Sequence, residues 1–410
     1  MSISSDENSM ARMPGGRPFR VLWAANATSN LADGIAFVSI PLLATSLTDD
    51  PRWVAGLATL YALVRLLGAL PIGVWVDRLD RRRILIVANL LRGAAVLGLA
   101  VCVHFDVGGL VLLYAAFAVI GTLESAADNA AVSLVPSIVA TRDLDRANGR
   151  LSAAQLVADE FAGPPLGGLL FTVAAAVPVF AMGGLWAAAG LVALGLPIRR
   201  VVASDAPETP RRSVAREAAS GASWLVRHRV VGGLALVGGL ASVGYMLPFS
   251  ILVVFAQEQL GLDGTGYGVI LAVSALGGLV GSFVTPRIRR RIGYRWTIVL
   301  SLLIGAASLF ALAVTRDAVV AAALLAAYIL HAVVWGICST SLRQRLVPEE
   351  LRGRVNAATR LAGLLGLALG SMLGGVLAVV HIALPVAVGG AAFVFCAGIA
   401  LLMLRVVDDD

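Results

Sequence analysis

Pro71–Arg83 reads Pro-Ile-Gly-Val-Trp-Val-Asp-Arg-Leu-Asp-Arg-Arg-Arg and separates two long apolar runs. The first run begins near Trp53 and ends at Asp77, and the second starts at Ile84. Basic loops between apolar segments stay in the cytoplasm when those segments insert into a membrane. A loop this short and this cationic therefore predicts a membrane hairpin whose turn lies in the cytoplasm.

The composition as a whole is typical of a polytopic membrane protein. Apolar residues make up 59% of the 410 residues, charged residues make up 14%, and the mean hydropathy is +0.88. A soluble domain is about half apolar and about a quarter charged. All 32 basic residues are arginine, so the chain has no lysine for a Walker A loop or a Schiff base. Energy for transport is therefore expected from an ion gradient or from a separate subunit.

The sequence offers no catalytic or metal-binding pattern. Cys102, Cys338 and Cys396 lie inside apolar runs without metal-ligand spacing, so we interpret them as buried small hydrophobic residues. No nucleophile–base set stands out either. We therefore predict a protein that is not an enzyme and that has no metal site and no cofactor.

Twelve apolar segments of the sequence are long enough to cross the ~30 Å hydrocarbon core of a bilayer. They lie near residues 20–46, 53–76, 84–104, 107–131, 147–172, 177–197, 231–256, 266–285, 295–314, 318–340, 356–379 and 383–404. The polar residues 1–17 contain no apolar core of the kind a signal peptide needs, so we expect a cytoplasmic tail there.

The arginines indicate the topology. With the N-terminus inside, the outside loops hold only Arg52 and Arg316, and the other loop arginines fall in cytoplasmic stretches. Membrane insertion favours this asymmetry, so the net charge of +7 is interpreted as topological and not as a nucleic-acid footprint. The sequence predicts a multi-pass, monomeric protein in the lipid bilayer of a bacterial cytoplasmic (inner) membrane, with both termini in the cytoplasm and no nucleic-acid partner.

The chain also repeats itself. Leu-Val-Pro at 134–136 recurs at 346–348, and Arg-Ala-Asn at 146–148 recurs as Arg-Val-Asn at 354–356. Such a repeat predicts two six-helix halves related by duplication. The predicted domains are a cytoplasmic tail (1–17), an N-terminal six-helix bundle (18–197), a cytoplasmic linker (198–230), a C-terminal six-helix bundle (231–405) and an acidic tail (406–410).

Within the linker, one helical face carries only apolar or small residues: Val214, Ala218, Gly221 and Leu225. Arginines lie on the other faces, so the pattern favours a short amphipathic helix at the membrane surface. The alternative is a flexible linker.

The spacing of Gly73, Asp77-Arg78 and Arg81-Arg82 resembles the signature loop between the second and third helices of the major facilitator superfamily. Asp80 departs from that signature, because it stands where the family usually has glycine. The resemblance implies an all-α membrane protein with twelve transmembrane helices in two pseudo-symmetric six-helix bundles. It also implies a gating role for the loop, with Asp128 and Asn356 as its partners, whereas a pure topology determinant is the alternative. The expected gating residues are Gly73, Asp77, Arg78, Arg81, Asp128 and Asn356.

A second motif lies in the fifth segment, where residues 163–168 read Gly-Pro-Pro-Leu-Gly-Gly. It is similar to the Gly-Pro motif of antiporters, and the whole pattern resembles the drug:proton antiporter branch, which includes macrolide-efflux pumps and the enterobactin exporter. Physically, such a motif gives a thin, kinked helix that packs close to a neighbour, so simple packing is the alternative. The motif residues are Gly163, Pro164, Pro165, Gly167 and Gly168.

Charged residues inside apolar segments cost about 2.5–3.5 kcal/mol each on insertion scales, so each needs a reason. Arg65 lies about 18 Å along a helix from Asp77, which places it near the bilayer centre, and Asp33 is similarly deep. One buried arginine cannot neutralise several carboxylates, so at least one acid is expected to hold a proton at neutral pH. A static ion pair without coupling is the alternative. The predicted proton-coupling or cation site comprises Asp33, Arg65, Glu124, Asp159 and Glu160.

The C-terminal half has no acid in the middle of a segment and offers an apolar and aromatic wall instead. We expect the substrate cavity to be lined by Gln155, Tyr245, Met246, Phe249, His331 and Trp335. The alternative is that these side chains only pack the bundle, and that His331 is a hydrogen-bonded core residue.

Together these features predict a proton-coupled secondary active exporter of amphiphilic drugs or similar small molecules, which exchanges protons for substrate by alternating access. Multidrug efflux and antibiotic resistance are the expected roles. Two alternatives stay open. One is a siderophore or metabolite exporter, or an importer, of the same fold, and the other is a receptor or lipid-handling protein that transports nothing.

Overall fold

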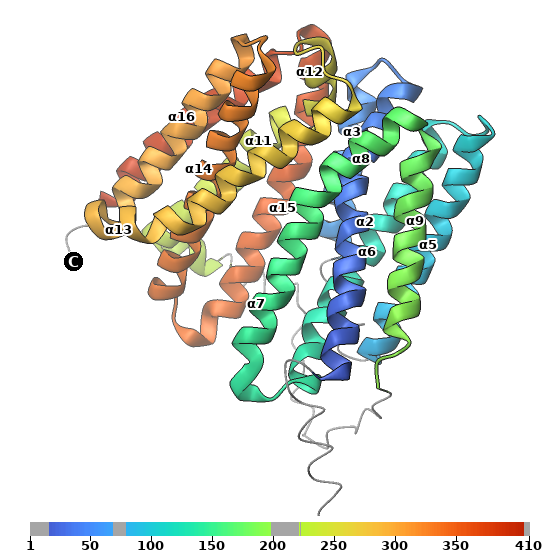
Figure 1. The fold of residues 1–410 in the computed structure, drawn as a ribbon. Helices are drawn as coiled ribbons and strands as arrows, with labels where there is room; N and C mark the ends of the chain where they lie inside the picture. The colour runs from blue at the N-terminus through green and yellow to red at the C-terminus, as the bar shows by residue number, and fades with distance from the viewer. Residues whose placement is uncertain (1–15, 69–78, 198–220, 222, 406–410) are drawn as a thin grey trace, which may run out of the picture. The chain divides into compact units, whose positions relative to one another are not determined.

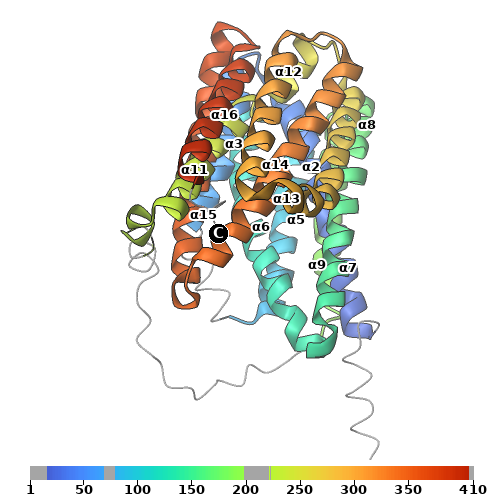
Figure 2. The same cartoon turned by 90° about the vertical axis from the view of Figure 1, so that its left-hand side faces the viewer.

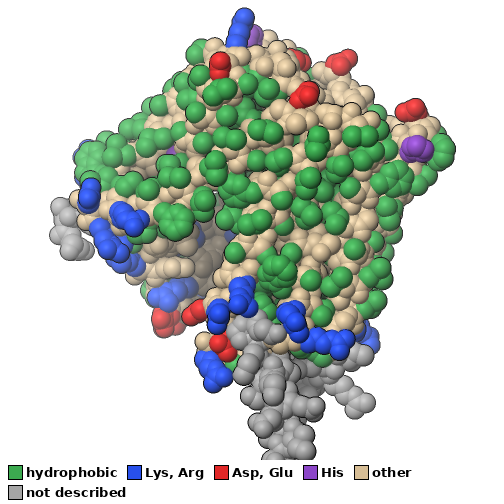
Figure 3. Space-filling view, in the orientation of Figure 1, with side chains coloured by type: hydrophobic (Ala, Val, Ile, Leu, Met, Phe, Trp, Pro, Cys, Tyr) green, Lys and Arg blue, Asp and Glu red, His purple; other side chains and the backbone are tan. Residues whose placement is uncertain are grey.

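The computed structural model describes residues 16–68, 79–197, 221 and 223–405, and no strand occurs among them (Figure 1). Nine of the helices in these ranges are long and apolar enough to cross a membrane. Hydrophobic side chains cover the sides of the helices, whereas basic side chains gather at helix ends (Figure 3). The two tails, most of the linker and residues 71–78 of the basic loop lie outside the described residues.

The chain divides into two compact units, Met1–Leu47 with Leu67–Pro207 and Thr48–Leu66 with Glu208–Asp410. The helices of the first unit are α2 (Arg17–Leu47), α5 (Arg81–His104), α6 (Leu110–Ile138), η1 (Thr141–Asp143), α7 (Leu144–Gln155), η2 (Leu156–Ala162), α8 (Gly163–Val173) and α9 (Ala176–Ala193). The predicted fifth segment is therefore built from α7, η2 and α8 in succession.

The second unit contains α3 (Pro51–Gly68), α11 (Arg229–Phe249), α12 (Leu252–Glu258), α13 (Gly264–Val314), α14 (Ala318–Leu346), α15 (Glu349–Val380) and α16 (Leu384–Met403). α13 is two helices joined at Gly293, whose φ of 76° is a backbone conformation that glycine adopts without strain. The break at Gly293 separates the predicted eighth and ninth segments, and α11 with α12 forms the seventh. Within the described residues, helix is found in each of the twelve predicted segments, in the second as far as Gly68.

The same pattern of neighbouring helices occurs in both units (Figures 1 and 2). In the first unit α2 packs against α8 and α9, and α5 packs against α6 and α9. In the second, α11 packs against α15 and α16, and α13 packs against α14 and α16. α3 groups with the second unit, where the hydroxyls of Thr59 and Ser371 on α15 are 2.9 Å apart.

Asp80 provides the N-cap of α5. Its side chain accepts a hydrogen bond from the backbone N–H of Arg82 at 2.9 Å, as N-cap aspartates commonly do. The adjacent arginines bind helix carbonyls: Arg81 donates to Ser133 O at 3.2 Å and Arg82 donates to Leu194 O, at the C-terminus of α9, at 2.7 Å. The departure from the family signature at residue 80 is therefore a helix cap.

The end of the linker packs against the start of α15. Leu225 is buried with Val231, Val347 and Val355. A Cβ atom at Gly221 would lie 2.3 Å from the carbonyl oxygen of Arg354, so only glycine fits there. Of the predicted amphipathic face, Gly221 and Leu225 lie in the described residues, and both pack within the second unit, to which they belong.

The Gly-Pro motif explains the irregular backbone of the fifth segment. Pro164 and Pro165 have no N–H to donate to the carbonyls of the preceding turn. The residues before them form η2, a π-helix, in which the N–H of Gly163 donates to Ala158 O, five residues back.

The same motif sets the closest contact between α2 and α8. A Cβ atom at Gly163 would lie 2.5 Å from Gly34 Cα, and one at Gly34 would lie 2.4 Å from Asp159 O. Gly167 continues this contact against Ile35 of α2. Small residues four apart let two membrane helices approach this closely.

Gly163→Ala is expected to lower the free energy of unfolding by about 1–3 kcal/mol, because the added methyl group meets backbone atoms that cannot move aside. Gly149→Ala is the matched control, since its Cβ would meet nothing within 4 Å. Thermal unfolding in detergent measures both. Equal melting temperatures for the two variants would contradict the close contact.

Candidate functional site

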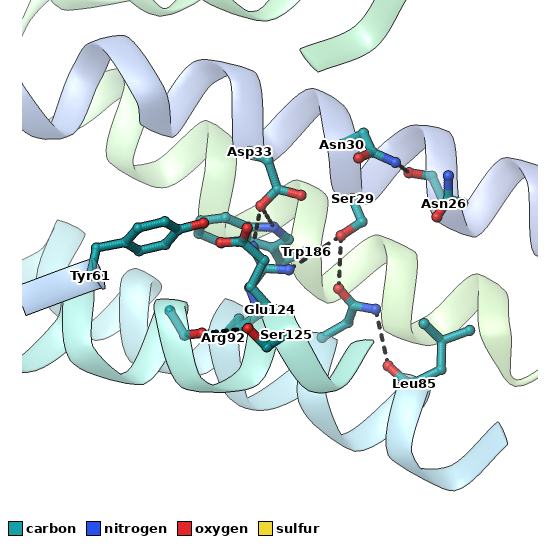
Figure 4. A network of polar contacts seen from close by, with 12 residues as sticks. Asn26, Ser29, Asn30, Asp33, Tyr61, Leu85, Arg92, Glu124, Ser125 and Trp186 are labelled. Carbon is teal, nitrogen blue, oxygen red and sulfur yellow. Dashed lines mark hydrogen bonds and ion pairs between the residues drawn. The ribbon is translucent and has the colours of Figure 1, made fainter. Parts of the chain in front are cut away.

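The centre of the first unit is the side chain of Arg92, in the middle of α5 (Figure 4). None of this side chain is exposed. Its guanidinium lies over the ring of Trp186 on α9, 4.3 Å from the ring centroid, which is cation–π geometry. A charge with no access to water must be compensated by neighbouring groups.

Two carboxylates supply that compensation. Asp33 on α2 accepts hydrogen bonds from Arg92 Nη2 and, at 3.2 Å, from Trp186 Nε1. Glu124 on α6 places Oε2 3.9 Å from Arg92 Nη2. The carboxylate side chains are 15% and 16% exposed, so both are largely buried but not sealed. Four helices therefore meet at one cation and two acids.

A chain of hydrogen bonds holds the guanidinium in place. Arg92 Nη1 donates to Ser29 Oγ at 3.4 Å, and this hydroxyl donates to Asn89 Oδ1 at 3.0 Å. Asn89 Nδ2 in turn donates to Leu85 O at 3.0 Å. Ser29 and Asp33 are four residues apart on α2, while Asn89 and Arg92 are three apart on α5, so each pair shares a helix face.

Asp159 lies close to this cluster. Its backbone contacts Gly34, the residue after Asp33, at the crossing of α2 and η2. Asp159 is partly buried, whereas Glu160 and Gln155 are exposed. Of the two adjacent acids, Asp159 is thus the one nearer to Asp33 in backbone position and the more buried.

The sequence predicts Arg65 as the buried cation beside these acids, and Arg92 is not part of that prediction. Arg65 is in α3, in the second unit, where its Nη1 donates to the hydroxyl of Tyr61 at 2.7 Å and its guanidinium lies 5.2 Å from the same ring. The structure pairs Asp33 and Glu124 with Arg92 instead. The sequence could have indicated Arg92 as a buried cation, because an arginine in the apolar run 84–104 has the same free-energy cost of membrane insertion as one near residue 65.

The aromatic residues of the second unit form a stack. Tyr245 stacks on Phe249 at 4.9 Å and on Tyr328 at 5.6 Å between ring centroids. Tyr328 is fully buried, and its hydroxyl donates to Tyr245 O at 3.0 Å. Tyr245, Met246, Phe249 and Trp335 are partly exposed. Sequence analysis did not identify Tyr328, although it lies one helical turn before His331.

His331 is enclosed by protein, with 1% of the residue exposed. Its Nδ1 is paired with Tyr328 O, and its ring meets Phe393 edge-on at 4.7 Å. A Cβ at Gly305 would lie 2.7 Å from the imidazole, so glycine makes room for the ring. In this conformation His331 is a packing residue and does not line an open surface.

Only part of the predicted gate can be placed. Gly73, Asp77 and Arg78 lie outside the described residues. Asp128 is exposed on α6, and Asn356 on α15 accepts a hydrogen bond from Arg343 Nε at 3.0 Å.

The helix arrangement and the central charge cluster define a multi-pass membrane transporter. The profile of the Major Facilitator Superfamily matches residues 22–370 and 234–410, and the chain belongs to that family. It is therefore a transporter and not an enzyme.

Several known proteins are similar to the chain. Enterobactin exporters EntS from Escherichia coli O1:K1 and Shigella boydii serotype 18 are 22% and 23% identical to it, and each alignment covers 87% of this chain and 84% of the relative. A bacterial homologue of the iron transporter ferroportin, solved in an inward-facing state, superimposes with a TM-score of 0.72 at 20% identity over 95% of this chain and 99% of its own. The D323A mutant of the nucleoside transporter NupG gives 0.73 at 11% identity over the same shares. At these identities the solved structures establish the fold.

Arg92→Gln is expected to destabilise the protein by about 3–5 kcal/mol, because it leaves buried carboxylates uncompensated. Combining it with Asp33→Asn removes one of those charges and should restore part of the loss, with a coupling energy of about 0.5–3 kcal/mol. The control cycle uses Arg142→Gln and Asp143→Asn, an arginine with 79% side-chain exposure whose pair should contribute about 0–1 kcal/mol. Thermal unfolding of the purified variants measures both cycles, and strictly additive effects at Arg92 and Asp33 would contradict the pairing.

Proposed function

We propose that this protein is a proton-coupled antiporter that exports small amphiphilic molecules by alternating access. The observation that carries the proposal is the imbalance of charge around Arg92. One buried guanidinium faces the carboxylates of Asp33 and Glu124, and the backbone of Asp159 lies against Gly34, the residue after Asp33.

This imbalance supports proton exchange for a physical reason. Arg92 can balance one carboxylate, and an unbalanced carboxylate inside a membrane protein is costly. A proton on a second acid removes that cost when the site is closed to water. Release of the proton to one side leaves a negative site that attracts a cationic or polar part of a substrate. Protons and substrate then compete for the same carboxylates, and this competition links their movements.

The aromatic stack of the second unit suits the apolar part of such a substrate. Tyr245 and Phe249 present partly exposed, stacked rings, and Met246 and Trp335 are partly exposed as well. Aromatic and apolar surfaces with a few polar groups are typical of small-molecule sites. We include these residues in the substrate surface and omit His331.

The remaining parts of the proposal concern gating and location. Asp77, Arg78 and Arg81 of the basic loop, together with Asp128, are the gating residues of the transport cycle. The protein acts as a monomer in the cytoplasmic membrane of a bacterium, with both termini in the cytoplasm. The excess of arginine in one set of loops supports this orientation.

A dedicated siderophore exporter is the second candidate. It is favoured by the relatives named enterobactin exporters, which align with this chain over most of their length. In that case the same carboxylate cluster would couple protons to the export of a siderophore, and the transport mechanism would be unchanged.

Asp33→Asn, Glu124→Gln and Asp159→Asn are expected to abolish proton-driven transport while the protein still reaches the membrane. Inverted vesicles that carry an imposed proton gradient are supplied in turn with ethidium, erythromycin and enterobactin, and uptake of each is measured. Asp106→Asn is the control, because this acid lies in an exposed loop of the same unit and asparagine tolerates its φ of 52°. Full activity in all three site variants would refute proton coupling at this site.

The same vesicles separate the candidate functions. Gradient-dependent uptake of ethidium or erythromycin supports drug export, whereas uptake of enterobactin alone supports the siderophore exporter. Uptake only into right-side-out vesicles would show an importer and would refute export.

A further inference from the structure

A groove of about 660 Å³ lies between the N-terminal part of α2 and the C-terminal half of α7 with the start of η2. Its walls are formed on α2 by Arg20, Trp23 and Ala27, and on α7 and η2 by residues that include Arg150, Ala154 and Val157. Arg20, Trp23 and Ala27 are three or four residues apart, as are Arg150, Ala154 and Val157, so each of these sets lies on one face. All of them belong to the first unit.

The groove follows from the way the two helices meet. α2 contacts η2 and α8 without intervening side chains at Gly34 and Gly163. Toward their N-termini, small alanines on both stripes leave the space between the helices unfilled. From Arg20 to Ala27 the groove follows about 11 Å of helix, which fits within the ~15 Å hydrocarbon depth of one leaflet.

The two ends of the groove differ in chemistry. Arg20 and Arg150 are both exposed at the N-terminal end, while the rest of the wall is almost entirely apolar. Trp23, 42% exposed, donates from Nε1 to Arg150 O at 3.3 Å and so fixes this end of the groove. Tryptophan is enriched at the level of lipid headgroups. In the space-filling view, basic side chains border hydrophobic ones at this end of α2 and α7 (Figure 3).

We propose that this groove is a binding site for one anionic phospholipid. An acyl chain lies along the alanines beside Trp23 and Val157, and the phosphate is held by Arg20 and Arg150. Val157 is 59% exposed, so the apolar wall is open to a membrane lipid. Basic pockets between membrane helices bind anionic headgroups for this electrostatic reason, and arginine is suited to phosphate in particular. This inference does not depend on proton coupling or on the transported compound.

The test uses quenching of Trp23 fluorescence by brominated lipid in phosphatidylcholine vesicles that contain the full-length protein. A minor fraction of the lipid is brominated phosphatidylglycerol in one arm and brominated phosphatidylcholine in the other. The Trp23 signal is obtained as the difference from Trp23→Phe. Stronger quenching by the anionic lipid is expected in the wild type. Arg20→Gln with Arg150→Gln should lower that preference about fivefold or more, because each basic residue near an anionic surface contributes about fivefold.

The matched control is Arg17→Gln with Arg146→Gln, which removes two exposed charges from the same helices outside the groove and should keep the preference. Ala154→Phe fills the groove without changing charge and should reduce quenching by both brominated lipids. Equal quenching by both lipids in the wild type would overturn the proposal, as would an equal loss in the control. Displacement of the lipid by ethidium would identify a solute site instead and would also overturn it.

Discussion

The free energy of hydration that Arg92 loses on burial has to be recovered from groups on other helices, and this requirement organises the first unit. The guanidinium has no exposed surface, and its partners come from α2, α6 and α9. Each partner is placed by the helix that carries it, so the burial of this charge depends on the packing of all four helices. The Ser29–Asn89–Leu85 chain of hydrogen bonds extends the same constraint to the backbone of α5.

In the second unit, aromatic side chains occupy the corresponding centre. The neighbour pattern relates α2, α5, α6 and α9 to α11, α13, α14 and α16. Where the first set brings together acids, an arginine and a tryptophan, the second brings together Tyr245, Gly305, Tyr328, His331 and Phe393. A duplicated fold thus carries one charged and one aromatic centre.

The fold could be predicted from the sequence almost completely, because helix length, apolar composition and arginine placement report directly on membrane insertion. The acids at positions 33, 124 and 159 could be predicted as site candidates for a similar reason, since charge in an apolar segment is rare. Which cation they face could not be predicted, because that depends on helix packing across distant parts of the chain. The choice between Asp159 and Glu160 also depended on packing, as did the burial of His331. The N-cap role of Asp80 was not predicted, because this residue was interpreted only as a departure from the glycine of the family signature.

The π-helix η2 changes the side of the fifth segment on which the residues after it lie. Ala154 and Gly163 both face α2, one in the groove and the other at the closest contact. In an uninterrupted α-helix, the nine residues between them would turn through about 900°, or two and a half turns, and would put them on opposite sides. The wider turns of η2 reduce this rotation. The irregularity that accompanies the prolines therefore helps to keep Ala154 and Gly163 on the same side of the segment, toward α2.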